Sequence, residues 1–179
     1  GVISGPGGVD IKGTGPVTFL GLNTYTGGTN VDGGSALIGN TDSLIGNFVD
    51  NGRLVFGSGT QGGYNVITGG TDAAGTYSGN ISGSGGVVIK SDGEIVTFTG
   101  TNTYTGGTTV EANSFFRGTT TSIQGDVLNR GAILFDQSNN GIYSGNISGN
   151  GYVKVRGGGE VTFSGQNSYT GGTYVYGPS

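Results

Sequence analysis

The residues that could do chemistry in this chain are its carboxylates, because histidine and cysteine are both absent. Without these residues there is no Ser-His or Cys-His nucleophile, and the two best zinc ligands are missing. Of the eleven acidic residues, only Asp92 and Glu94 form a close pair, in a Ser-Asp-Gly-Glu stretch that is typical of a turn. The paired-acid geometry of a polysaccharide-cleaving enzyme is therefore not indicated, and we expect no enzyme.

Other ligand-binding motifs are also weak. A calcium-binding repeat needs Gly-Gly-x-Gly-x-Asp in series, but the Gly-Gly-Val-Asp stretch at 7–10 lacks the later glycine and is not repeated. The seven basic residues are scattered singly, apart from Lys154 and Arg156, whereas nucleic-acid binding needs a dense positive face. We expect no metal, no cofactor and no nucleic-acid partner.

The composition indicates which elements must position these side chains. Glycine supplies 43 of the 179 residues, and the formal net charge is −4. Valine, isoleucine and threonine dominate over leucine and alanine, and β-branched side chains suit a pleated surface and are stiff in helices. No window shows apolar residues at helical spacing over three turns. We therefore predict an all-β fold built of short strands.

The most regular feature is the sequence Asn-Thr-Tyr-Thr-Gly-Gly-Thr at 23–29. It recurs at 102–108 and, with Ser168 in place of the first Thr, at 167–173, each time preceded by Val-Thr-Phe. A string that occurs three times cannot form one active site, so we interpret it as a structural unit. Its key residues are Asn23, Tyr25, Gly27, Gly28, Asn102, Tyr104, Gly106, Gly107, Asn167, Tyr169, Gly171 and Gly172.

Strand alternation predicts the orientation of the residues around the first copy. Val17 and Phe19 should point inward and Thr18 outward. The three Thr residues of the motif at 24, 26 and 29 suit exposed strand positions. Tyr25 could lie inward with its hydroxyl group reaching the surface, or outward as a platform for a ligand. We favour the inward orientation, since a buried Tyr with a satisfied hydroxyl group is common.

The remaining motif residues suit corners of the chain. Asn23 could adopt the left-handed conformation or bond a neighbouring backbone group. The glycine pair should supply a positive φ angle where a Cβ atom would clash. In the second copy, at least one of Gly106 and Gly107 should have a positive φ, and the other should tolerate alanine.

The spacing of the copies defines the repeat units. The interval from Tyr25 to Tyr104 is longer than the interval from Tyr104 to Tyr169, which indicates an insertion within 57–76. We expect one segment, 1–179, with repeat units at approximately 3–80, 81–146 and, in part, 147–179. The shorter interval suggests a repeat of three coils of about 22 residues each. The segment begins and stops inside repeats without an initiating Met, so we expect an excised piece whose end coils fray or associate with another copy.

Two architectures compete for such short strands. A β-sandwich pairs strands that are adjacent in sequence, whereas a β-solenoid stacks each strand on its counterpart one coil later. The repeats favour the solenoid.

The motif and its frame, Val-Thr-Phe-Leu-Gly-Leu-Asn-Thr-Tyr-Thr-Gly-Gly-Thr at 17–29, resemble the autotransporter-associated β-strand repeat, also called the passenger-associated transport repeat. The Gly-rich step at 33–39 continues the resemblance, and the stretch at 113–118 departs from it. The resemblance implies a right-handed parallel β-helix with about three short strands per rung. It also implies a passenger segment that is exported to the bacterial cell surface and is joined to a C-terminal outer-membrane barrel.

Three functional hypotheses remain in order of preference. The first is a rod-like structural segment that promotes secretion. The second is an adhesin module that binds host glycan or protein or associates with itself. For this second role the insertion is the candidate binding loop, since loops that leave a solenoid commonly bind ligands. Its candidate residues are Gln61, Tyr64, Asn65, Thr71 and Asp72. The third and least favoured hypothesis is the carboxylate-based enzyme.

Overall fold

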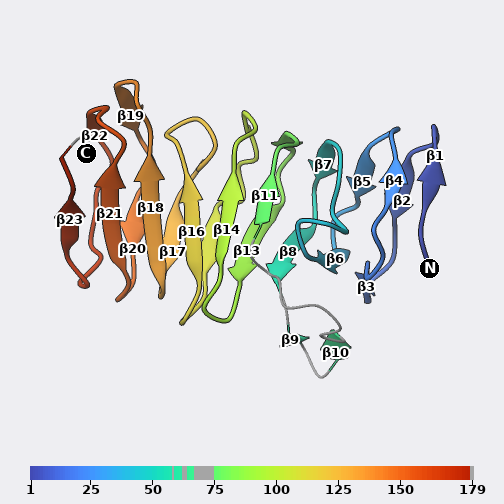
Figure 1. The fold of residues 1–179 in the computed structure, drawn as a ribbon. Helices are drawn as coiled ribbons and strands as arrows, with labels where there is room; N and C mark the ends of the chain where they lie inside the picture. Colours follow the sequence, from blue (N-terminus) through green and yellow to red (C-terminus); the bar gives the residue numbers. More distant parts are fainter. Residues whose placement is uncertain (58, 62–63, 67–74, 178–179) are drawn as a thin grey trace.

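In the computed structural model of the protein, which describes residues 1–57, 59–61, 64–66 and 75–177, the chain coils into a parallel β-solenoid of about eight turns. Figure 1 shows the coils stacked from one terminus to the other. The prediction of an all-β chain is confirmed, and within the described ranges no helix forms that could span a membrane. At roughly 4.8 Å between stacked strands, eight coils make a rod about 35–40 Å long.

A complete coil contains three strands, one on each of three faces, as predicted. The coil formed by β11, β12 and β13 visits the six-stranded, the four-stranded and the seven-stranded sheet in turn. The first face holds β1 (Ser4–Gly5), β4 (Thr24–Tyr25), β11 (Gly75–Tyr77), β14 (Ile95–Phe98), β16 (Phe115–Gly118), β18 (Ala132–Asp136), β21 (Tyr152–Arg156) and β23 (Thr173–Val175).

The other two faces are built in the same way. The second face holds β2 (Val9–Ile11), β5 (Thr29–Val31), β7 (Phe48–Asp50), β12 (Ile81–Ser82), β19 (Gly141–Tyr143) and β22 (Val161–Phe163). The third face holds β3 (Pro16–Thr18), β6 (Ala36–Gly39), β8 (Arg53–Gly57), β13 (Gly86–Lys90), β15 (Thr108–Val110), β17 (Val127–Asn129) and β20 (Ile147–Ser148). Every pairing within these faces is parallel.

The strand register corrects the expected coil length. Val127 pairs with Ile147, and the hydrogen bond from Asn146 to Asp126 beside this pair has the same sequence separation of 20. One coil is therefore shorter than the repeat spacing suggested.

The insertion appears as one longer step in the stack. Phe48 pairs with Ile81, and the neighbouring bond from Asn80 to Asn47 has the same sequence separation of 33. The additional residues leave the stack between β8 and β11. There β9 (Gly59–Gln61) and β10 (Tyr64–Val66) form an antiparallel pair (Figure 1). The predicted position of the insertion is thus confirmed.

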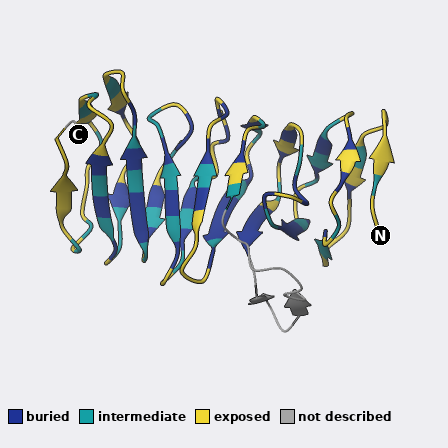
Figure 2. Cartoon of the chain, in the orientation of Figure 1, coloured by how far each residue is buried: buried dark blue, intermediate teal, exposed yellow. Residues whose placement is uncertain are grey.

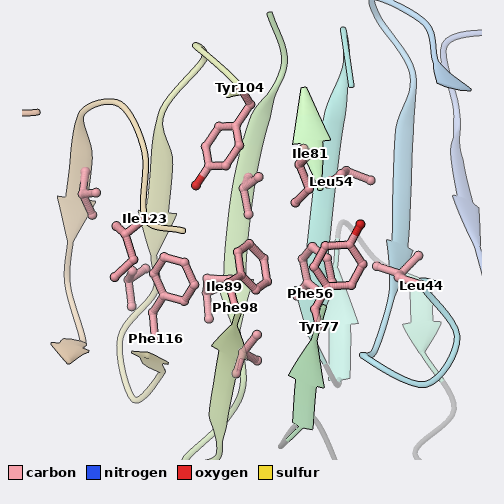
Figure 3. Packing of buried hydrophobic residues seen from close by; sticks show 14 of the residues in the cluster. Leu44, Leu54, Phe56, Tyr77, Ile81, Ile89, Phe98, Tyr104, Phe116 and Ile123 are labelled. Atoms are coloured by element: carbon pink, nitrogen blue, oxygen red, sulfur yellow. The ribbon is translucent and has the colours of Figure 1, made fainter. Parts of the chain in front are cut away.

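One continuous hydrophobic core runs through the stack, from Ile11 near one end to Val155 near the other. Phe98 lies at its centre, with its ring centroid 4.8 Å from Phe56, 5.3 Å from Tyr77 and 4.9 Å from Phe116 (Figure 3). Buried and less buried residues alternate along strands such as β16 and β21 (Figure 2), because successive side chains of a strand point to opposite sides. The core therefore holds each coil to the next along the whole rod.

Candidate functional site

The three copies of the repeat motif lie on three different faces of the solenoid. The Thr-x-Val end of the copies forms β5 on the second face, β15 on the third and β23 on the first. From one copy to the next the chain completes its coils and then adds one further strand, so each copy is displaced by one face. The copies consequently do not form one continuous stripe on the surface.

The Asn of the motif connects three successive coils. Asn23 is buried, and its Oδ1 accepts a hydrogen bond of 2.9 Å from the backbone N–H of Ile3 in the preceding coil. Its Nδ2 donates a bond of 2.8 Å to the carbonyl oxygen of Ser43 in the following coil. The predicted bond to a neighbouring backbone group is thus present. The alternative, a left-handed Asn23, is wrong, since its φ is not positive.

The second copy repeats this arrangement, and the third copy keeps the bond from the preceding coil. Asn102 accepts from the backbone N–H of Ile81 at 2.8 Å and donates to the carbonyl oxygen of Ser122 at 2.7 Å. Asn167 accepts from the backbone N–H of Ile147 at 2.9 Å. The same side chain therefore receives the same bond on each face.

The Tyr of the motif points inward, as expected. Tyr25 and Tyr104 are each 2% exposed, and Tyr169 is partly buried against the core. The hydroxyl group of Tyr104 bonds Thr108 Oγ1 at 2.7 Å, and burial raises the pKa of Tyr104 to about 12. The same Tyr–Thr pair recurs between Tyr25 and Thr29. The rings of Tyr25 and Tyr104 are therefore unavailable as platforms for a ligand.

This pairing overturns the expectation that Thr29 is exposed. Thr24 and Thr26 do lie exposed, but Thr29 is buried because its hydroxyl group is the partner that the Tyr25 hydroxyl group needs inside the core. Thr108 is buried for the same reason. In the first two copies the fourth residue after the motif Tyr is therefore part of the core, whereas Thr173 of the third copy is exposed.

The two glycines of the motif are required for different reasons. Gly107 has a φ of +77°, and Gly28 and Gly172 share this conformation, so the predicted positive φ is confirmed. Gly106 has no positive φ, but a Cβ atom there would lie 2.4 Å from the carbonyl oxygen of Gly85 in the preceding coil. The expectation that Gly106 tolerates alanine is wrong, because the backbones of two coils approach closely there.

The candidate binding loop is described only in part. Gln61, Tyr64 and Asn65 lie on β9 and β10, where Tyr64 is the register partner of Gln61. Thr71 and Asp72 lie outside the described residues. A binding role for this loop stays a prediction.

In the part of the chain that the structure describes, the carboxylates do not gather into a group that could hold a metal ion. Asp92 and Gly93 form the expected turn, with φ angles of +48° and +104°, and the backbone N–H of Glu94 donates to the carbonyl oxygen of Ser91. No group of three or more acidic side chains within the described ranges could hold a metal ion.

The sequence reasoning missed two arrangements that only the stacking of coils creates. On the outer side of the first face, Asp136 Oδ2 forms ion pairs with Arg117 Nε at 3.4 Å and with Arg156 Nη2 at 2.8 Å. In the core, Asp50 is fully buried, and desolvation raises its pKa to about 6. Opposite charges that are one coil apart in the sequence are the signal that could have found the first arrangement, once the coil length was known.

Comparison with known proteins agrees with the repeat. The model of the Passenger-associated-transport-repeat matches residues 12–35, 88–112 and 155–177. The chain is 34% identical over 154 residues to the Adhesin BmaC autotransporter of Brucella suis biovar 1 (strain 1330). That alignment covers 76% of this chain and 4% of the relative, so the chain spans a small part of its length. No solved structure gives a match.

Proposed function

We propose that this chain, which carries three copies of the passenger-associated transport repeat, is a structural and secretion-promoting segment of a bacterial autotransporter passenger. Its role is that of a rod-like scaffold that carries and spaces other parts of the passenger. The observation that supports this role most directly is the buried motif Asn, which bonds the coils before and after it.

This bonding suits a chain that folds progressively as it leaves the cell. Asn102 Oδ1 receives its bond from the coil that precedes it in sequence, and its Nδ2 is then directed at the coil that follows. Each coil that has folded thus presents polar groups, and an edge of parallel strand, to the coil that arrives next. The absence of cysteine fits such export, since no disulfide-locked loop can obstruct passage.

The location and partners of the segment follow from the same proposal. The chain would lie at the cell surface or outside the cell, after export across the outer membrane. Its partners would be the remainder of the passenger and the C-terminal outer-membrane barrel. We also propose the units 3–80, 81–146 and 147–179 as the repeats of this scaffold.

The exported fraction of a passenger that carries the Asn102→Ala substitution tests this proposal. The substitution leaves two buried backbone groups without partners, at a cost of about 2–4 kcal/mol. We expect less passenger at the cell surface, measured by accessibility to an added protease. Asn139→Ala is the matched control, because Asn139 is exposed. Full export of the Asn102→Ala passenger, together with a confirmed loss of stability, would contradict a role of the motif in secretion.

An adhesin module is the second candidate, and one observation favours it: the relative is named an adhesin. Such a module would bind host glycan or protein, or another copy of itself. The repeat family and this relative both fit a role that is not enzymatic. The scaffold remains the better supported proposal, because the Asn of the repeated motif forms hydrogen bonds between coils inside the molecule.

A further inference from the structure

Strands β16, β18, β21 and β23 lie side by side on the first face (Figure 1). Basic and aromatic residues of these strands lie on the outer side of this face. Val153 and Val155 on β21 are buried in the core, so the residues between and beside them point outward. We term six residues the basic–aromatic patch: Tyr152, Lys154 and Arg156 on β21, Arg117 on β16, Tyr174 on β23, and Tyr176 directly after β23.

Strand register places the patch in rows that run along the rod. Arg117 pairs with Leu134, Leu134 with Lys154, and Lys154 with Tyr174, so these side chains form one row across four strands. Stacked strands are roughly 4.8 Å apart. A linear polymer that lies along this row therefore meets a new side chain at every coil.

The patch is positive on an acidic protein. Among the described residues, the carboxylate that forms ion pairs with the patch is Asp136, which is shared by Arg117 and Arg156 at 3.4 and 2.8 Å. Three cations and one carboxylate leave a net charge of +2, whereas the whole chain carries −4. Arg117 Nε is buried and makes no hydrogen bond, so the shared carboxylate does not satisfy all the donors of the pair.

The aromatic rings flank these cations. The rings of Tyr152 and Tyr174 meet edge to face at 5.9 Å, and Lys154 Nζ lies 5.2 Å from the Tyr152 ring centroid. Tyr174 and Tyr176 are about half exposed. A surface hollow of about 740 Å³ lies among Arg117, Lys154, Arg156 and Tyr176. The patch thus combines cationic donors with exposed ring faces and has room for a ligand.

The equivalent row of the first repeat shows that the fold does not require these charges. Ile38, Val55 and Val88 occupy the positions of Arg117, Leu134 and Lys154, with the same parallel register between their strands. All three are apolar and buried, at 2–5% exposure. A hydrophobic row and a charged row therefore suit the same backbone, and the charged row is free to serve a ligand.

We propose that the basic–aromatic patch binds a linear acidic polysaccharide, one that carries carboxylate or sulfate groups. The Arg guanidinium groups match the planar oxygens of carboxylate and sulfate, and Lys154 adds a point charge. The Tyr rings supply apolar faces and hydroxyl donors that suit the two sides of a sugar ring. The scaffold role does not depend on this site.

The charges favour an acidic polysaccharide over a nucleic acid. Double-stranded DNA carries one negative charge per roughly 1.7 Å and needs many cations. A patch of +2 on a chain of −4 cannot offset that density. A polysaccharide with an acidic group on each sugar carries fewer charges per unit length and suits the spacing of the coils.

Titration calorimetry of the whole chain tests the site with four probes at low salt: a heparin-derived octasaccharide, a polygalacturonate octamer, neutral dextran and single-stranded oligothymidine. We expect one or both acidic glycans to bind, neutral dextran not to bind, and affinity to fall with added salt. Binding of the octasaccharide alone identifies sulfate as the recognised group, and binding of polygalacturonate identifies carboxylate.

The double variant Lys154→Gln/Arg156→Gln should lower the affinity by about tenfold or more, as expected for lost charge-assisted bonds. Arg130→Gln is the matched control, because Arg130 has the same side-chain exposure as Arg156, 45%, and also pairs with a carboxylate. It should change the affinity less than about twofold, and both variants should keep the unfolding midpoint of the unaltered chain. The proposal is overturned if neither acidic glycan binds, if Arg130→Gln weakens binding equally, or if oligothymidine or dextran binds as tightly.

Discussion

The turn between β7 and β8 and the turn between β17 and β18 occupy equivalent places in two repeats, but they begin with different residues. The second turn begins with Asn129, whose Oδ1 accepts a bond from the backbone N–H of Gly131 and whose Nδ2 donates to the carbonyl oxygen of Tyr152. The first turn begins with Asp50, whose Oδ1 accepts the same bond from Gly52. The two side chains differ only in their second polar atom.

That second atom has no hydrogen-bond partner in the first turn. Asp50 Oδ2 is buried and unbonded, although the backbone around it matches the second turn. The backbone N–H of Gly85 donates to the carbonyl oxygen of Asp50, and the backbone N–H of Gly151 donates to the carbonyl oxygen of Asn129. The backbone N–H of Gly86 donates to the carbonyl oxygen of Gly52, and the backbone N–H of Tyr152 donates in the same way to Gly131. Gly86 is thus the equivalent of Tyr152, and its carbonyl oxygen corresponds to the acceptor of Asn129 Nδ2.

The comparison indicates that the backbone of both turns offers an acceptor to the second polar atom of the first side chain, so a hydrogen-bond donor fits there. A neutral Asp50 can donate its proton where Asn129 donates N–H, but an ionised Asp50 turns a buried charge toward an acceptor. Burial raises the pKa of Asp50 to about 6, and only the bond from Gly52 counteracts this. The residues in contact with Asp50 across the stack, Val31, Gly83 and Gly85, carry no charge.

The largest expected effect comes from the aromatic stack that joins the two repeats. Phe98→Ala removes contacts to Phe56 of the first repeat and Phe116 of the second, and should cost about 3–5 kcal/mol. Urea unfolding measures this cost. Thr97→Ala, at the neighbouring, less buried position, should cost under about 1 kcal/mol. Equal costs would contradict the assignment of Phe98 to the core and of Thr97 to the outer side of β14.

The next largest effect should follow from giving the second turn the residue of the first. Asn129→Asp at pH 7 replaces the donor to the Tyr152 carbonyl oxygen by a charged acceptor in a fully buried position. We expect a loss of about 2–4 kcal/mol in the free energy of unfolding, most of it recovered at pH 4. If the substitution is neutral at pH 7, the equivalence of the two turns is wrong.

The reverse exchange should stabilise the protein. The folded pKa of Asp50, about 6, lies above its ordinary value of 3.8, so the folded chain holds the proton more tightly. The contribution of Asp50 to stability is therefore complete below about pH 4 and is lost as the pH rises through 6. Asp50→Asn removes this loss, and we expect a gain of about 1–3 kcal/mol at pH 7 and little change at pH 4.

Urea unfolding of the two proteins at a series of pH values checks the sign of this effect. The difference in the free energy of unfolding should grow between pH 4 and pH 6 and then level off. A difference that does not change with pH would mean that Asp50 keeps the same protonation state throughout. A loss of stability at pH 7 would mean that the carboxylate has a partner that an amide cannot replace.

The parts of this fold that the sequence predicted are those set by neighbouring residues. Alternation along a strand predicted that Val17 and Phe19 point inward: Phe19 is buried in the core, and Val17 is partly buried against it. The corner glycines indicated the positive φ at Gly107. The repeats indicated a solenoid. These features depend on strand geometry and local sterics, which a single repeat already contains.

The features that were missed depend on contacts from one coil to the next. The clash at Gly106, the burial of Thr29 and the sharing of Asp136 between Arg117 and Arg156 all need the coil length, which the repeat length does not give directly. A repeat of three coils and one further strand cannot be told from three longer coils without the strand pairing. The roles proposed for the motif and for the insertion loop stay predictions.

The smallest expected effect concerns the middle residues of the two turns, Asn51 and Arg130. Both are exposed: Asn51 Oδ1 accepts from the backbone N–H of Ser84 at 3.2 Å, and Arg130 pairs with Glu111 at 3.3 Å. Exposed pairs contribute little, so Asn51→Ala and Arg130→Ala should each change the free energy of unfolding by less than about 1 kcal/mol. Urea unfolding at pH 7 would show whether either substitution approaches the effect of Asn129→Asp. If either substitution does, the exposed middle residues also contribute to the difference in stability between the two turns. The hydrogen-bond donor at the buried first position would then no longer explain that difference alone.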